Sequence, residues 1–121
     1  MTNLFNDEDN VLALEELMYI LFIFASFISI NATNELKEAK NKQFYNQSGI
    51  QEQYILANYL FLIVFITFLI RNYKALDNID TNSEEYKYAK ARFIGSLLIV
   101  IGQILIIYYI SNTTTYKKEC N

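Results

Sequence analysis

The sequence lacks histidine, proline and tryptophan, and its only cysteine is Cys120. Without histidine the usual catalytic triads cannot be assembled, and the sequence has neither a glycine-rich phosphate-binding loop nor a cluster of metal ligands. A lone cysteine cannot form an intrachain disulfide. We therefore expect no enzymatic activity, no cofactor and no bound metal.

Positive charge is missing where targeting or nucleic-acid binding would need it. The first ten residues contain Asp7, Glu8 and Asp9 but no lysine or arginine. Because a cleavable signal peptide begins with basic residues, we expect the first apolar stretch to be retained. The formal net charge is −3 and the isoelectric point about 4.9. No basic patch indicates a nucleic-acid partner.

Charge is almost absent from three stretches, residues 17–32, 54–70 and 93–110. Each approaches the roughly 20 residues that cross a hydrocarbon core of about 30 Å. A soluble three-helix bundle would need a polar face on every helix, and residues 93–110 have none. Their leucine, isoleucine, phenylalanine and valine residues, each contributing roughly −0.3 to −0.6 kcal/mol to insertion, outweigh one glutamine.

The sequence therefore predicts an all-α integral membrane protein with three transmembrane helices, built as one domain over residues 1–121. The predicted spans cover about residues 13–32, 54–70 and 93–110. The lipid bilayer is the expected environment. An abundance of isoleucine, asparagine, lysine and tyrosine is typical of an AT-rich genome, so we expect a bacterial plasma membrane.

The first two helices are expected to extend beyond their spans. Asp9 or Asn10 is suited to cap the first helix. No glycine or proline stops that helix at the end of its span, so it should continue toward about Asn46. Ser48 and the glutamine three residues later match a capping box, which places the start of the second helix near Gly49.

A protruding hairpin is expected between the second and third helices. The second helix should run past Ile70, because the following residues show no stop signal. Residues 77–83 are rich in asparagine, aspartate and serine, which favours a turn. The third helix should then start at Asn82 or Ser83.

Topology is decided by two arginines. The two sides of the predicted bilayer carry equal numbers of lysine and arginine residues. Arg71 and Arg92, however, directly adjoin their spans, where positive charge has most influence on orientation. We therefore expect the N-terminus to lie inside.

Glu15 and Glu16 stand at the start of the first span, on the same side as Arg71 and Arg92. If the spans begin level with one another, these four residues form a charged ring in which carboxylates pair with arginines. Alternatively, the first helix is shifted so that both glutamates are submerged. A submerged carboxylate is a functional site by default, often for protons or cations.

Two further polar features lie inside the spans. Glu15, Tyr19, Ser26, Ser29 and Thr33 form a stripe on one face of the first helix. Aligning the parallel first and third spans predicts that Ser26 approaches Gly102, because small residues permit close helix packing. Gln103 needs a partner away from water. That partner is either inside the bundle, with Ser26 one candidate, or in a second copy of the chain.

These features lead to one main functional hypothesis and two alternatives. The main one is a small non-catalytic accessory or regulatory subunit that interacts with another membrane protein or with itself. The first alternative is a holin-like pore former, although the C-terminal tail carries only two lysines where holins usually have a dense basic tail. The second alternative is an ion or proton conductor that uses Glu15 and Glu16.

Overall fold

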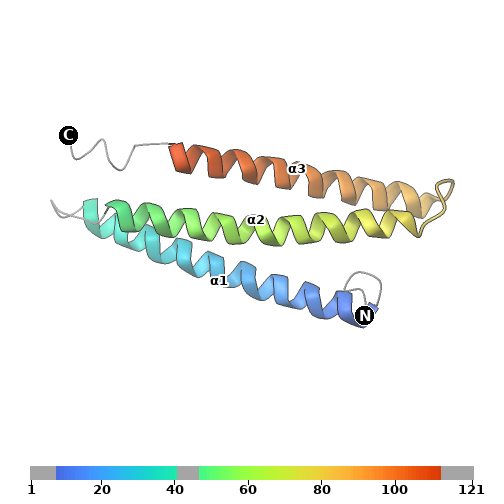
Figure 1. Cartoon of the computed structure of the whole chain (residues 1–121), viewed down its shortest axis with the longest axis horizontal. Helices are drawn as coiled ribbons and strands as arrows, with labels where there is room; N and C mark the ends of the chain where they lie inside the picture. Colours follow the sequence, from blue (N-terminus) through green and yellow to red (C-terminus); the bar gives the residue numbers. More distant parts are fainter. Residues whose placement is uncertain (1–7, 41–46, 113–121) are drawn as a thin grey trace.

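A computed structural model describes residues 8–40 and 47–112, which form three α-helices and no strand. These are α1 (Glu8–Lys40), α2 (Gln47–Asp77) and α3 (Glu84–Asn112), shown in Figure 1. Each is long and apolar enough to cross a membrane. The predicted all-α fold with three membrane-spanning helices is confirmed, and the architecture is that of a small multi-pass membrane protein.

The helices are longer than the apolar stretches they contain. They have 33, 31 and 29 residues, and at 1.5 Å per residue they are roughly 44 to 50 Å long. A hydrocarbon core is only about 30 Å thick. Their ends therefore extend beyond it, as expected for the first helix and for the hairpin.

The start of α1 corrects one expectation. The helix is already formed at Glu8, so Asp9 and Asn10 lie in its first turn and neither is its N-cap. Acidic residues in a first turn are favoured by the helix dipole, which accounts for their position equally well. The predicted extension of this helix to about Asn46 falls on residues outside the described part of the chain.

The turn between α2 and α3 is the one that the sequence predicts. Asp80 organises it: its carboxylate accepts a hydrogen bond from the Asn82 amide at 3.1 Å, and its carbonyl accepts one from the Ser83 amide at 3.1 Å. The Ser83 hydroxyl then accepts a hydrogen bond from the Tyr86 amide at 3.2 Å. Ser83 is therefore the N-cap of α3. The α2 helix begins at Gln47, two residues before the predicted Gly49, so Ser48 lies in its first turn and is not the N-cap that the capping box predicted.

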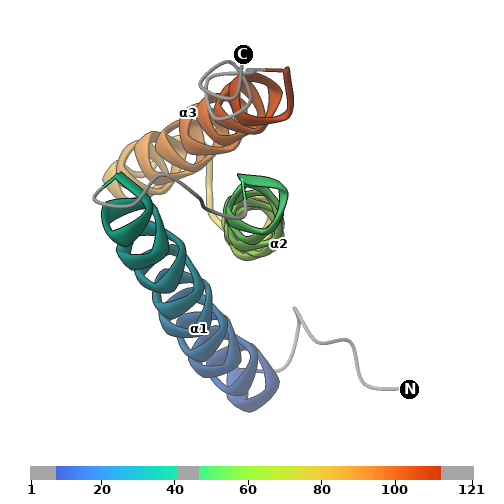
Figure 2. The ribbon, with the colours of Figure 1, turned by 90° about the vertical axis from the view of Figure 1, so that its left-hand side faces the viewer.

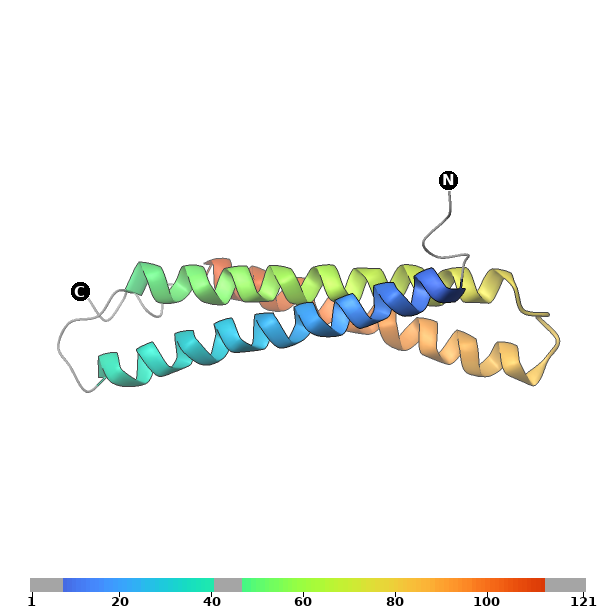
Figure 3. The same cartoon turned by 90° about the horizontal axis from the view of Figure 1, so that it is seen from below.

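The helix α2 is the centre of the assembly. Within the described residues α1 and α3 each pack on α2, and they do not contact each other. Figure 2 looks along α2 and shows the other two helices flanking it, and Figure 3 shows α1 slanting across it. Successive helices run in opposite directions, so the α2–α3 turn and the start of α1 lie at one end (Figure 1).

A seam of small residues joins α1 to α2. The buried apolar residues of α1 recur every seven positions, as do those of α2: Met18, Ala25, Ala32 and Ala39 on α1, and Ile50, Ala57 and Val64 on α2. A seven-residue repeat is typical of helices that cross at about 20°. Alanines at the contact let the two backbones approach closely. The packing face of α1 therefore combines this alanine seam with part of the predicted polar stripe, since Glu15, Tyr19 and Thr33 also contact α2.

Candidate functional site

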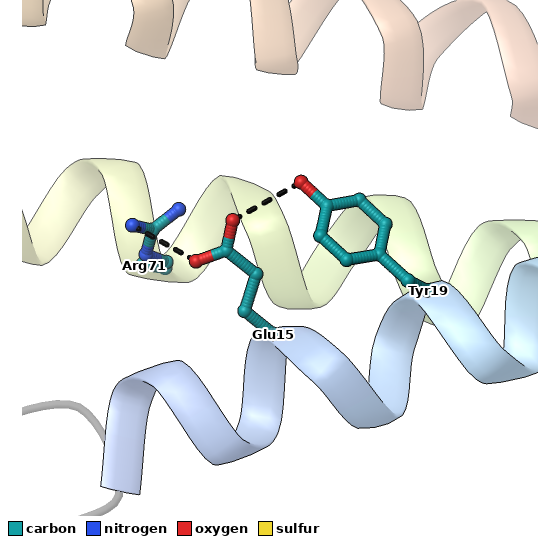
Figure 4. A network of polar contacts seen from close by, with 3 residues as sticks. All are labelled: Glu15, Tyr19 and Arg71. Atoms are coloured by element: carbon teal, nitrogen blue, oxygen red, sulfur yellow. Dashed lines mark hydrogen bonds and ion pairs between the residues drawn. The ribbon is translucent and has the colours of Figure 1, made fainter. Parts of the chain in front are cut away.

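The Glu15 carboxylate is held between α1 and α2 (Figure 4). One oxygen lies 3.2 Å from Nη2 of Arg71, and the other accepts a hydrogen bond of 3.0 Å from the Tyr19 hydroxyl. The ring of Tyr19 in turn contacts that of Phe68 on α2, with centroids 5.6 Å apart. The expected pairing of a glutamate with an arginine is therefore present. It places Glu15 level with Arg71, the residue directly after the second apolar stretch.

The predicted ring of four charges is only half assembled. Glu16 and Arg92 are both exposed, and neither forms an ion pair with a described residue. Adjacent residues of a helix point about 100° apart, so only one of two neighbouring glutamates can face α2. Arg92 belongs to α3, which within the described residues packs on α2 and not on α1. The two arginines nevertheless line one pocket.

Gln103 is buried at the contact between α3 and α2. Its amide nitrogen donates to both the carbonyl and the side-chain oxygen of Asn58, at 3.0 Å and 2.8 Å. The Asn58 amide nitrogen donates to the Tyr54 carbonyl at 2.7 Å. Bonds of this kind satisfy polar groups where water is absent. The internal partner of Gln103 is thus Asn58, which the sequence did not indicate.

The predicted approach of Ser26 to Gly102 is wrong. The Ser26 hydroxyl donates to the Phe22 carbonyl of its own helix at 2.9 Å. A Cβ atom added at Gly102 would meet nothing within 4 Å in the described chain. The physical reason is that α1 buries its alanines and α3 its glutamine against the same central helix. Parallel alignment of the first and third spans does not bring them into contact.

A second polar contact between α2 and α3 also escaped prediction. Asn72 is buried and donates to the Ser96 hydroxyl, which donates to the Arg92 carbonyl at 3.0 Å. The Asn72 side-chain oxygen is buried without a hydrogen-bond partner. Asn72 directly follows Arg71, just past the second apolar stretch, in a segment that the sequence predicts to be helical without indicating a partner. Only the packing of α3 reveals its role.

The opposite end of the bundle carries its own polar cluster. Gln53 of α2 donates to the Glu35 carboxylate at 2.9 Å and accepts from the Asn31 amide at 2.7 Å. Nearby, the Thr33 and Tyr54 hydroxyls are 2.7 Å apart. Together with the Glu15–Arg71 pair, this cluster joins α1 to α2 at both ends of the apolar zone.

The polar groups described here connect neighbouring helices. No described group of three histidine, cysteine, aspartate or glutamate residues could hold a metal ion. The Glu15 contacts lie between α1 and α2, whereas those of Gln103 lie between α2 and α3. No known protein family, curated protein or solved structure matches this chain. The exposed surfaces of the helices are therefore the features that bear on function.

Proposed function

We propose that this protein is a small non-catalytic membrane subunit that associates through α3 with a helix of another membrane protein. The observation that carries the proposal is the outer side of α3, which we call the glycine face: Gly95, Leu98, Ile99, Gly102, Leu105 and Ile106. Its four large residues are all exposed. The residues that α3 buries against α2 lie on a different side: Ala89, Val100, Gln103 and Ile107.

The two glycines distinguish this face from an ordinary lipid-facing surface. Leucine and isoleucine suit contact with acyl chains, but lipid does not require glycine, which lowers helix stability by about 1 kcal/mol relative to alanine. Within the described chain nothing lies within 4 Å of a Cβ added at Gly95 or Gly102. Glycines one heptad apart let a second helix approach closely. Their placement supports an intermolecular contact.

The alternatives have less support. A proton or cation conductor needs an available carboxylate, whereas Glu15 is engaged by Arg71 and Tyr19. Glu16 is exposed on the outside of α1 and not enclosed between helices. A pore assembled from several copies would need a polar helix face, while the large exposed side chains of the spans are mostly aliphatic or aromatic.

We also propose that the N-terminus and the α2–α3 turn lie on the cytoplasmic side of a bacterial plasma membrane. Arg71 and Arg92 support this orientation because both adjoin the apolar zone at the same end of the bundle. Positive charge next to a span favours retention on the cytoplasmic side. Cysteine accessibility at Lys87 compared with Asn112 would test the orientation.

The association can be tested by placing a photo-crosslinking amino acid at Leu98 or Leu105 in the producing cell. We expect a specific adduct with a second polypeptide, and a loss of at least about ten-fold in that adduct when Gly102→Leu fills the space that a partner helix needs. The same probe at Phe27, exposed on α1, is the control for general proximity.

The fold of Gly102→Leu should be unchanged, because within the described residues nothing lies within 4 Å of a Cβ added at that position. Circular dichroism and thermal unfolding would verify this. Adducts that persist in Gly102→Leu, or that form equally from Phe27, would contradict the proposal. An adduct of twice the chain's mass would replace the heteromeric partner by a second copy.

A further inference from the structure

A pocket of about 280 Å³ near the α2–α3 turn is lined by residues from all three helices. Its wall contains Arg71 and Lys74 from α2 and Arg92 from α3. Residues 71 and 74 are three apart, so they project from the same face of their helix. Three cations from two helices thus surround one concave site.

Two of the three cations are available to a ligand. Arg71 is paired with Glu15, but Lys74 and Arg92 form no ion pair with any residue in the described ranges. The Ser96 hydroxyl bonds to the backbone carbonyl of Arg92 and leaves its guanidinium uninvolved. In the wall itself the three cationic groups outnumber the one carboxylate, that of Glu8.

Nearby carboxylates offset part of the positive charge of the pocket. Glu8 of α1 is the one carboxylate in its wall, and Glu15 lies behind Arg71. Glu85 lines a neighbouring hollow that Arg92 also reaches. With Arg71 paired to Glu15 and one further cation offset by Glu8, the wall itself keeps one positive charge, which a singly charged phosphodiester would balance.

The pocket lies at the depth of lipid headgroups. Arg71 follows the second apolar stretch directly and Arg92 precedes the third, so both mark the edge of the hydrocarbon zone. Val11 and Leu12 of α1 form an apolar part of the wall, and Leu12 is exposed. A ligand with a phosphate next to an acyl chain matches both parts of this lining.

We propose that this pocket binds the phosphate of an anionic phospholipid, with Lys74 and Arg92 as its principal contacts. A guanidinium presents a planar fork of donors to phosphate oxygens, and a lysine adds a flexible point charge. Basic pockets between transmembrane helices are suited to anionic headgroups. This site is independent of the glycine face.

To test this, the full chain in a non-ionic detergent is mixed with phosphatidylglycerol or with phosphatidylcholine. Native mass spectrometry then counts the lipids that stay bound. We expect phosphatidylglycerol to be retained in preference. Lys74→Gln and Arg92→Gln should each weaken that retention about five-fold, because a basic residue near an anionic headgroup contributes about that factor.

Matched controls are available on α3, where Lys87 and Lys90 are exposed and do not line the pocket. Lys87→Gln and Lys90→Gln should leave retention unchanged, and Lys74→Arg should preserve it. Gly102→Leu should also bind the lipid normally, which separates this proposal from the proposed subunit role.

Three results would overturn the proposal: equal retention of the two lipids, equal losses in the control variants, or full retention in a Lys74→Gln, Arg92→Gln double variant. Millimolar inorganic phosphate provides a further arm. Displacement of phosphatidylglycerol by phosphate alone at such concentrations would show a site for the free anion and refute the lipid assignment. Continued binding of phosphatidylglycerol in the presence of phosphate would support the lipid assignment.

Discussion

The contact between Gln103 and Asn58 gives the sharpest quantitative prediction. Gln103→Leu removes two hydrogen bonds, one to the Asn58 side chain and one to its carbonyl. Asn58→Ala removes the side-chain acceptor but leaves the backbone carbonyl in place. The glutamine substitution should therefore destabilise the protein more than the asparagine substitution does.

The magnitude follows from measured hydrogen bonds between transmembrane helices. Such bonds average about 0.6 kcal/mol in double-mutant cycles, with a maximum near 1.7 kcal/mol. Two bonds therefore predict a loss of about 1 to 2 kcal/mol for Gln103→Leu. The coupling between the two substitutions should be roughly 0.6 to 1.7 kcal/mol, because only the side-chain bond depends on both residues.

Reversible unfolding in mixed micelles, for the parent, both single variants and the double variant, would measure these values. Ser26→Ala is a matched control inside the spans, since its hydroxyl bonds only to its own helix, and it should have little effect. A coupling below about 0.3 kcal/mol, within the usual error of additivity, would refute the assigned pairing. Loss of an oligomer in Gln103→Leu would point instead to a bond between chains.

Three other substitutions test separate parts of the fold. Glu15→Gln weakens the pair with Arg71, whose two side chains are 20% and 27% exposed. The free energy of unfolding should fall by up to about 1 kcal/mol, whereas Glu16→Gln should leave it unchanged. An equal effect of the two substitutions would contradict the geometry. Ala32→Leu overfills the fully buried seam and should cost about 1 to 3 kcal/mol in the same unfolding assay, whereas Ala91→Leu, at an exposed position, should be tolerated. Ser83→Ala removes the N-cap of α3 and should lower its stability by about 1 kcal/mol, which would be measured as faster amide exchange in the first turn. Ser83→Asp should restore protection from exchange. Unchanged exchange in the alanine variant would count against the cap.

The central place of α2 has a consequence for how the protein tolerates change. Both flanking helices depend on it, α1 through alanines and α3 through buried amides. Close backbone packing and interhelical hydrogen bonds are the main sources of helix association in lipid, because apolar side chains gain little by leaving acyl chains. Substitutions on α2 at Ala57 and Asn58 should therefore be less tolerated than those on outward-facing leucines.

Local features of the sequence determined the elements of this fold. Unbroken apolar stretches of near-membrane length required three spanning helices, since a soluble helix needs a polar face. The turn at residues 77–83 and the cap at Ser83 followed from side chains that bond to their own backbone. The pairing of Glu15 with Arg71 was also predictable, because both charges adjoin the same end of the apolar zone.

Tertiary structure alone decided which helix faces meet. In helices that are apolar on nearly every side, the apolar residues do not mark one face, so the sequence does not distinguish a packing face from a lipid-facing one. The seven-residue spacing of Ala25, Ala32 and Ala39 was a readable signal, but a stripe with serine competed with it. The partner of Gln103 and the separation of α1 from α3 depend on how complete helices cross, because a hydrogen bond or close contact needs two surfaces at one depth and angle. The sequence predicts the depth of each residue in the membrane, whereas only the packed helices fix the angle at which they cross.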